Sequence, residues 1–347
     1  MSEHPIRDLA DKVIGAFKHG APEDGETPSV ASRPDPVTGD VKERVSRTSE
    51  TLDFNVEDIQ GVCLRGPKVL LDRRHMSPFV WQEPDGRFGI MLRAVPALDQ
   101  PQTDTGQIWA GWSHDGVTFD MLEQPSLVGG PDEDDIGGVE DPTVLRCDDG
   151  SYVVYYTGVA ADMAHGELFY ASGLSPDRLT KAGVALASTK SMGNTKEATV
   201  GRTADGHWRL FYEYAADQAS RIGLAVGPAV GGPWEEKPTP FMPREDGWDN
   251  WHLSTGPMLM DDPDRPIMFY NGATRDARWR IGWIAFDRAC RHVVDRCVQP
   301  LLTPPPTSDR TDTDIAFAAS VIVDQGEVWL YYSLEDQRLS RARLRQT

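Results

Sequence analysis

A repeat of about 60 residues runs through most of this 347-residue chain and limits its possible folds more than any other feature. Each copy contains one strongly aromatic or aliphatic segment that is typical of a buried β-strand. With the central residues of these segments aligned, successive copies lie 63, 56, 58 and 62 residues apart. The segments are FGIMLRA (88–94), YVVYYTG (152–158), WRLFYEY (208–214), PIMFYNG (266–272) and VWLYYSL (328–334), with Leu92, Tyr155, Phe211, Phe269 and Tyr331 as equivalents.

Each aromatic segment is preceded by another strand-like segment and followed by a third. The preceding segments are SPFVWQ (77–82), EDPTVLRC (140–147), KEATVGRT (196–203), GPMLMDD (256–262) and AASVIVD (318–324). No helical pattern of useful length interrupts the series, which excludes a parallel α/β sheet, and two packed sheets would not explain a fivefold period. The sequence therefore predicts an all-β fold, a five-bladed β-propeller.

The two ends of the repeat region suggest how the ring closes. The fifth unit stops after its third strand, and VCLRGPKVLLD (62–72) could supply the missing outer strand. Apolar residues over 5–18 have the period of a short amphipathic helix, and the Pro- and Gly-rich segment after it predicts an extended arm. We therefore expect an N-terminal helix and flexible arm over 1–60 and a propeller catalytic domain over 61–347.

Charge and composition exclude several functions. The formal net charge of −19 disfavours binding to nucleic acids and to polyanionic substrates. No apolar run approaches the ~20 residues of a membrane helix, and no secretory signal is apparent, so we expect a cytoplasmic protein. The four cysteines show no CxxC spacing, which argues against a zinc or redox site.

Polar residues at the starts of the first strands are the strongest site candidates, because the innermost strands of a propeller surround its central channel. A carboxyl group there could have a raised pKa and act as a general acid. Equally, a pair such as Glu140 and Asp141 could be only a solvated strand end. The candidates are Ser77, Glu140, Asp141, Lys196, Glu197, Trp251 and His252.

Several of these segments, in order along 75–345, resemble glycoside hydrolase family 130, the five-bladed β-mannoside phosphorylases and mannosidases. GGVEDPT (137–143) is similar to the family's GxEDPR motif, and YNG (270–272) to its YHG. The other similar segments are TKEATVGR (195–202), RIGWIAFDRACRHVVDRCVQPLLTP (280–304) and YYSLEDQRLSRARL (331–344). Family 43, with the same fold, is the nearest neighbour with which this pattern could be confused.

The resemblance implies roles for three residues. Asp141 would donate the proton to the glycosidic oxygen, Asp336 would contact the sugar at the cleaved position, and Arg93 would bind substrate or anion. For Asp336 a surface turn, and for Arg93 a structural ion pair, are the simpler alternatives.

Departures from the family pattern concern phosphate binding. The arginine after EDP is Thr143 here, a His-Arg pair is Tyr212-Glu213, and the histidine of YHG is Asn271, while Lys196 is retained. A phosphate dianion needs charge-assisted donors, which this site has largely lost. Inverting hydrolysis instead needs a second carboxylate as base.

Glu213 is the first candidate for that base and Glu197 the second, although Glu213 could merely pair with Lys196. We therefore expect inverting hydrolysis of a β-mannoside or related short glycoside. Phosphorolysis and a non-catalytic glycan-binding propeller are the alternatives.

Other expectations concern ligands and partners. Tryptophans could form stacking platforms for a sugar, and Trp251, His252 and Asn271 are candidate substrate contacts. No organic cofactor is implied, inorganic phosphate would be a co-substrate only for a phosphorylase, and no carboxylate spacing demands a channel cation. The N-terminal helix could pack on its own chain or on a second copy. The tryptophans concerned are Trp109, Trp112, Trp248, Trp251 and Trp279.

Overall fold

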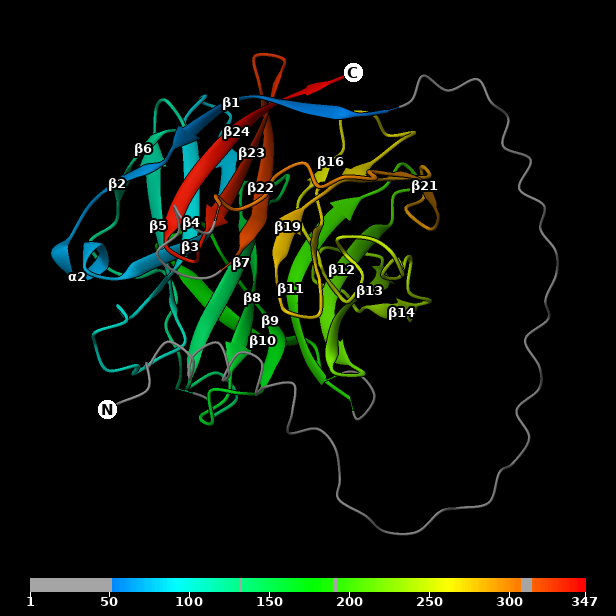
Figure 1. Cartoon of the computed structure of the whole chain (residues 1–347). Helices are drawn as coiled ribbons and strands as arrows, with labels where there is room; N and C mark the ends of the chain where they lie inside the picture. Colours follow the sequence, from blue (N-terminus) through cyan, green and yellow to red (C-terminus); the bar gives the residue numbers. More distant parts are fainter. Residues whose placement is uncertain (1–51, 132, 190–192, 307–313) are drawn as a thin grey trace, which may run out of the picture.

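The computed structural model describes residues 52–131, 133–189, 193–306 and 314–347 (Figure 1). The helix predicted over 5–18 and most of the arm predicted over 1–60 lie outside these ranges. Within them nearly all regular structure is β-strand, and the α-helix found there is the four-residue α2 (Lys68–Leu71). No helix in this described part is long and apolar enough to cross a membrane.

The sheets follow the sequence repeat, because successive segments of each unit form neighbouring antiparallel strands. The first three units each form one sheet. Their strands are β3 (Arg74–Gln82), β4 (Phe88–Val95), β5 (Gln107–Ser113), β6 (Thr118–Met121) and β2 (Cys63–Arg65); β7 (Gly138–Arg146), β8 (Tyr152–Val159), β9 (Gly166–Gly173) and β10 (Leu179–Leu186); and β11 (Gly193–Arg202), β12 (Trp208–Ala216), β13 (Ala219–Gly227) and β14 (Glu235–Lys237).

The fourth unit is divided between two short sheets, and the fifth forms one sheet that combines both ends of the described chain. The fourth unit consists of β15 (His252–Ser254), β18 (Asn271–Ala273) and β19 (Trp279–Ile281), with β16 (Met258–Leu259), β17 (Ile267–Met268), β20 (Ile284–Phe286) and β21 (Val293–Arg296). The fifth consists of β22 (Ala316–Asp324), β23 (Glu327–Leu334), β24 (Arg338–Gln346) and β1 (Phe54–Gly61).

The strand that completes the fifth sheet is β1, so the prediction that residues 62–72 would supply it is wrong. β1 pairs with β24 from Phe54 opposite Gln346 to Gly61 opposite Ser340. Most of 62–72 instead forms β2, which pairs with β6, and α2. β1 is half exposed and contains few large apolar residues, so its sequence is hard to distinguish from that of an arm.

The core confirms the alignment of the repeat. Leu92, Tyr155, Phe211, Phe269 and Tyr331, which were taken as equivalent from sequence, are all fully buried at 0% exposure. Each lies in or beside the second strand of its unit, where large side chains pack between neighbouring sheets.

The turns between first and second strands repeat as well. In the first four units an aspartate side chain accepts a hydrogen bond from the backbone N–H two residues later, at 2.9 to 3.0 Å. Such Asx turns reverse the chain over few residues. The aspartates are Asp85, Asp149, Asp205 and Asp262.

Side-chain hydrogen bonds join neighbouring units, in four of the five cases between their first strands. Thr143 Oγ1 donates to Ala198 O at 2.6 Å, and Thr199 Oγ1 donates to Gly256 O at 2.9 Å. The remaining links are Asn271 Nδ2 to Ala318 O, Ser320 Oγ to Pro78 O, and Ser77 Oγ to Asp141 Oδ1. Together they connect all five units in a closed circle, with the first strands innermost.

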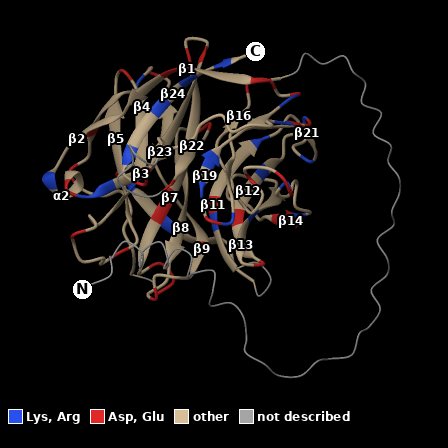
Figure 2. Cartoon of the chain, viewed as in Figure 1, with Lys and Arg blue, Asp and Glu red and all other residues tan. Residues whose placement is uncertain are grey.

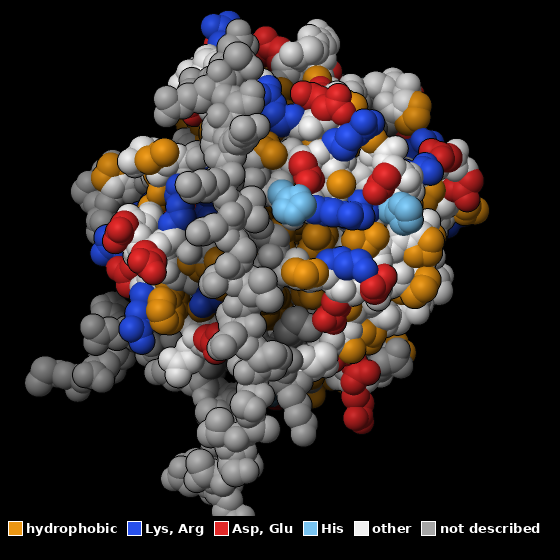
Figure 3. All heavy atoms as spheres, turned by 90° about the vertical axis from the view of Figure 1, so that its right-hand side faces the viewer, with side chains coloured by type: hydrophobic (Ala, Val, Ile, Leu, Met, Phe, Trp, Pro, Cys, Tyr) orange, Lys and Arg blue, Asp and Glu red, His pale blue; other side chains and the backbone are white. Residues whose placement is uncertain are grey.

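Charged residues are distributed differently inside and outside this circle. Figure 2 shows acidic and basic residues on β7, β11 and β12, and basic residues on β24 as well. On the outer face in Figure 3, acidic, basic and hydrophobic side chains are interspersed wherever described residues are visible. The inner charges are therefore the unusual ones, since burying a charge is costly unless it is paired.

Candidate functional site

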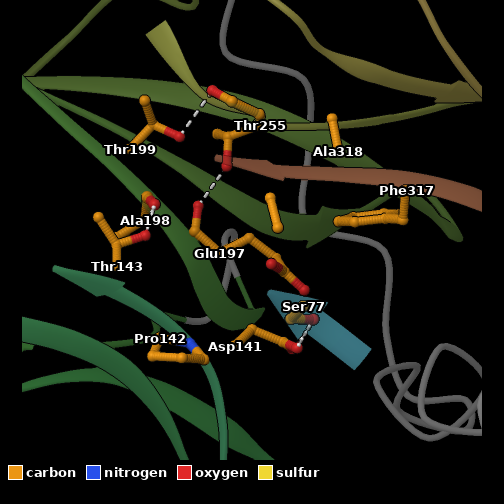
Figure 4. A pocket seen from close by; sticks show the side chains of 12 residues that line it. Ser77, Asp141, Pro142, Thr143, Glu197, Ala198, Thr199, Thr255, Phe317 and Ala318 are labelled. Carbon is orange, nitrogen blue, oxygen red and sulfur yellow. Dashed lines mark hydrogen bonds between the residues drawn. The ribbon is translucent and has the colours of Figure 1, made fainter. Parts of the chain in front are cut away.

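A pocket lies where the inner strands approach one another (Figure 4). Three units contribute polar residues to it, while the fourth and fifth contribute mainly small or apolar ones. The lining residues are Ser77, Asp141, Pro142, Thr143, Glu197, Ala198, Thr199, Thr255, Gly256, Phe317, Ala318 and Ala319.

The inner strands are irregular at this pocket, in the same place in each unit. The pairing register shifts between Met76 and Phe79, between Glu140 and Thr143, between Lys196 and Thr199, and between Ala318 and Ser320. In the fourth unit the strand is interrupted instead, between β15 and β16. Bulges of this kind redirect side chains and are common beside active sites.

Three bulge residues have left-handed backbone conformations and meet in the pocket. Ser77, Asp141 and Glu197 have φ values of 52°, 49° and 53°. The Ser77 hydroxyl donates to the Asp141 carboxylate, and Glu197 also hydrogen-bonds to Asp141. In Figure 4 these three side chains point toward one another. A non-glycine residue with this φ is strained, and such strain is concentrated at functional sites.

Arg93, on β4, holds the two acidic residues of the EDP segment. Its guanidinium lies 2.5 Å from Glu140 Oε1 and 3.3 Å from Asp141 Oδ2. It also donates to Thr105 O at 2.9 and 2.7 Å through Nε and NH2. The structural ion pair considered from sequence is therefore present, and it places Arg93 directly behind the pocket carboxylate.

Lys196 and Glu213 form a second ion pair behind the pocket. Their side chains lie 3.5 Å apart, on residues that face each other across β11 and β12. Ser220 Oγ also donates to Glu213 Oε1 at 2.8 Å. Glu213 is buried and does not line the pocket. It therefore influences the pocket through its ion pair with Lys196 and through its own negative charge.

The carboxyl groups of Glu197 and Asp141 differ in pKa. Burial, and then the carboxylates of Asp141 and Glu213, raise the pKa of Glu197 well above its usual range. Burial alone would raise the pKa of Asp141 too, but Arg93 and the hydrogen bonds from Ser77 and Glu197 lower it overall. Of these two hydrogen-bonded carboxyl groups, Glu197 is therefore the one that binds a proton more readily.

Both cations stay charged within this acidic surrounding. Burial lowers the pKa of Lys196, but Glu213, Glu197 and other carboxylates outweigh it, and the pKa rises overall. The same balance raises the pKa of Arg93, where Asp336 is one of the acids responsible. Asp336 lies in the turn after β23, half-buried and with a φ of 53°. Its charge thus acts on the site from the fifth unit.

The remaining predicted contacts make hydrogen bonds within the protein. Asn271 is fully buried; its Nδ2 donates to Thr255 O and Ala318 O, and its Oδ1 accepts from Ala318 N. His252 Nδ1 accepts from Ser220 N at 3.1 Å, and burial lowers the pKa of this histidine. Both side chains thus have partners within the protein, and neither lines the pocket.

The tryptophans mostly pack within the fold. Trp109 is buried at 1% exposure, and Trp248 stacks on Tyr270 with ring centroids 5.5 Å apart. Trp251 donates to Gln218 O, outside the pocket lining. No group of three or more His, Cys, Asp or Glu residues within the described ranges could hold a metal ion.

Phe317 and Thr255 line the pocket but were not singled out from the sequence. Phe317 precedes the segment aligned as the fifth first strand by one residue, and its pairing with the second strand is equivalent to that of Glu140 and Lys196. Counting from the strand starts for apolar as well as polar residues would have found it.

Comparisons of sequence give no match, either to family models or to curated proteins. Comparison of structures does. A glycosyl hydrolase from Bacteroides ovatus has a TM-score of 0.63 at 19% identity, covering 78% of this chain and 84% of that one. A β-1,2-mannobiose phosphorylase from Listeria innocua, solved with β-1,2-mannobiose, has a TM-score of 0.64 at 16% identity, covering 87% and 92%.

A third solved structure comes from work on the GH130 family of mannoside phosphorylases, described as containing glycoside hydrolases that target β-1,2 mannosidic linkages in Candida mannan. It has a TM-score of 0.65 at 18% identity and covers 78% of this chain and 84% of that one. These similarities show that the chain has the fold of glycoside-processing enzymes of the GH130 type. A shared fold does not determine the reaction, which depends on the residues of the site.

Proposed function

We propose that this protein is a five-bladed propeller glycoside hydrolase that cleaves a β-mannoside or a related short glycoside with inversion. The observation that carries the proposal is the pair formed by Asp141 and Glu197, two hydrogen-bonded carboxyl groups in the pocket whose pKa values shift in opposite directions, so that the pair can hold one shared proton. The fold shared with glycoside hydrolases and mannoside phosphorylases supports the substrate class.

In the proposed reaction, a water molecule attacks the anomeric carbon as the bond to the leaving-group oxygen breaks. Asp141 transfers the shared proton to that oxygen, and Glu197 is the group that stores the proton in the free enzyme. A base accepts the proton lost by the water, so the products are two sugars and no net charge is created.

Glu213 is the proposed base, and because it does not line the pocket it would act on the attacking water through one bridging water molecule. Inverting hydrolysis requires roughly 6.5–9.5 Å between the acid and base carboxyl groups, so that a water molecule fits between them. Glu197 is hydrogen-bonded to Asp141 and is too close to serve in that way. Glu213 belongs to the next strand and is held by Lys196 and Ser220.

Phosphorolysis is the second candidate, because a solved mannobiose phosphorylase has the same fold. In that reaction, inorganic phosphate would replace water as the nucleophile. Both nearby cations, Arg93 and Lys196, already have carboxylate partners, and Thr143 occupies the place of the family's arginine. A phosphate dianion would therefore meet more negative than positive charge, which favours hydrolysis.

Product analysis tests the proposal. The wild-type protein, Asp141→Asn and Glu213→Gln would be incubated with a panel of β-mannosides, with and without inorganic phosphate. We expect free sugar without phosphate, formed initially as the inverted anomer in proton NMR, and a loss of at least about 100-fold in kcat for Asp141→Asn. Azide should partly restore Glu213→Gln by replacing water at the anomeric carbon.

The alternatives predict other results. Formation of sugar 1-phosphate only in the presence of phosphate would show that the reaction is phosphorolysis and contradict the proposed hydrolysis. Retention of the anomeric configuration would contradict the inverting mechanism. Binding of mannosides without turnover, unchanged in Asp141→Asn, would indicate a glycan-binding propeller.

A further inference from the structure

The pocket has two unlike walls. Ser77, Asp141 and Glu197 make one wall polar. The fifth unit contributes Phe317 and two alanines on β22, and the break in the fourth unit contributes Gly256. Figure 4 shows Phe317 extending from a separate strand toward the side of the pocket where Ser77 and Glu197 lie.

Phe317 is braced from behind by other aromatic rings. Its ring packs against the Trp279 ring with centroids 5.5 Å apart and an interplanar angle of 63°. Trp279 in turn packs against His252, at 5.6 Å. Phe317 itself is half-buried, so part of its surface is available to the pocket. An edge-to-face pair of this kind restricts the ring orientation.

The backbone beside Phe317 is also held firmly. Both backbone polar groups of Ala318 bind the Asn271 side chain, at 2.7 Å for the N–H and 3.2 Å for the carbonyl. Ser320 Oγ donates to Pro78 O and accepts from Val80 N, which ties β22 to β3 beside Ser77. Asn271 thus positions the wall, which accounts for its burial beside a pocket that it does not enter.

Small residues surround the aromatic ring. A side chain at Gly256 is impossible, because a Cβ would lie 1.8 Å from Phe269 O. Ala318 and Ala319 each carry only a methyl side chain. Apart from Phe317, the described residues of this wall therefore carry no side chain larger than a methyl group.

We propose that Phe317 is a stacking platform for one uncharged pyranose ring, whose C–H face lies on the phenyl ring and whose hydroxyls face Ser77, Asp141 and Glu197. The electron-rich face of an aromatic ring attracts the partly positive C–H groups of a sugar. The sugar is uncharged because Arg93 and Lys196 already have carboxylate partners and a uronate would face Asp141. This assignment deepens the proposed function and shares its substrate class, but sugar binding does not require turnover.

Binding measurements test the platform separately from catalysis. Methyl β-mannoside and methyl β-glucuronide would be titrated calorimetrically into wild-type protein, Phe317→Ala, Phe317→Tyr and the control Trp112→Ala. Trp112 is also half-buried and packed against an aromatic ring, but it lies on β5 outside the pocket. Thermal unfolding and near-UV circular dichroism would show that each variant is folded.

We expect Phe317→Ala to weaken methyl β-mannoside binding about tenfold, while Phe317→Tyr and Trp112→Ala change it less than about threefold. Mannoside binding that is lost in Phe317→Ala without any turnover by wild-type protein would support the platform and contradict the proposed hydrolysis. Equal binding by folded Phe317→Ala and wild-type protein would overturn the platform. Tighter binding of the glucuronide, or no mannoside binding by wild-type protein, would overturn the assigned ligand.

Discussion

The hydroxyl of Ser77 donates a hydrogen bond to the carboxylate of Asp141, although the two residues are 64 positions apart and belong to different sheets. Both have left-handed backbone conformations, with φ of 52° and 49°. Equivalent bulges in neighbouring units thus turn their side chains toward each other. Ser77 is a positioning residue in this arrangement, since its contact is with the carboxylate that we assign as proton donor.

Removing the Ser77 hydroxyl should raise the pKa of Asp141, because the hydrogen bond favours the ionised form. We expect the basic limb of the kcat/KM profile, and the Asp141 carboxyl titration in ¹³C NMR, to move to higher pH in Ser77→Gly and Ser77→Ala alike. Glycine tolerates the positive φ, so Ser77→Ala should be less stable than Ser77→Gly by about 1 kcal/mol.

Ser151→Gly is the control for this experiment, because it removes a serine–aspartate hydrogen bond from an exposed turn. It should leave both the pH profile and the Asp141 titration unchanged. An unshifted Asp141 titration in Ser77→Gly would show that Ser77 does not control the protonation of the pair.

Glu197→Gln should stabilise the protein, and more at pH 8 than at pH 5. The folded-state pKa of Glu197 lies above its unfolded value, so the folded state is penalised as pH rises from the ordinary glutamate range through that raised pKa. Glutamine cannot ionise and avoids the penalty. Urea unfolding of the wild-type protein and Glu197→Gln at the two pH values measures this stability penalty. The same variant should lose activity, because the pair formed by Asp141 and residue 197 can then no longer store a proton.

An exposed glutamate provides the comparison for that prediction. Glu123→Gln should change the free energy of unfolding by less than about 0.5 kcal/mol at either pH. The explanation fails if the gain from Glu197→Gln is the same at pH 5 and pH 8.

Asn271→Ala should lower the free energy of unfolding by about 3 kcal/mol, because it removes three buried hydrogen bonds and leaves Thr255 O and Ala318 N without those partners. Chemical denaturation measures this loss. Asn55→Ala, at an exposed position of β1, should have little effect. A fully stable Asn271→Ala with impaired sugar binding would instead indicate that Asn271 contacts the substrate, as the sequence led us to expect.

The sequence repeat predicted the main features of the fold because the determinants are local. Strand periodicity and aromatic second strands recur in each unit and aspartate turns in the first four, and each can be recognised without knowledge of the others. β1 shows the limit of this approach: its few apolar residues carry little signal, and it becomes a strand only because β24 presents an unpaired edge to it.

By itself the sequence determined the repeat, the positions of the acidic residues at the starts of the first strands, and the loss of the cationic residues expected for phosphate binding. Only the tertiary structure decided that Asp141 and Glu197 meet, that their pKa values shift in opposite directions, that Glu213 pairs with Lys196, and that Asn271 supports the Phe317 wall. Burial and inter-unit hydrogen bonds govern these relationships. Most of them join residues of different units, such as Asn271 and Ala318, which are 47 positions apart along the chain, so spacing within one unit does not reveal them.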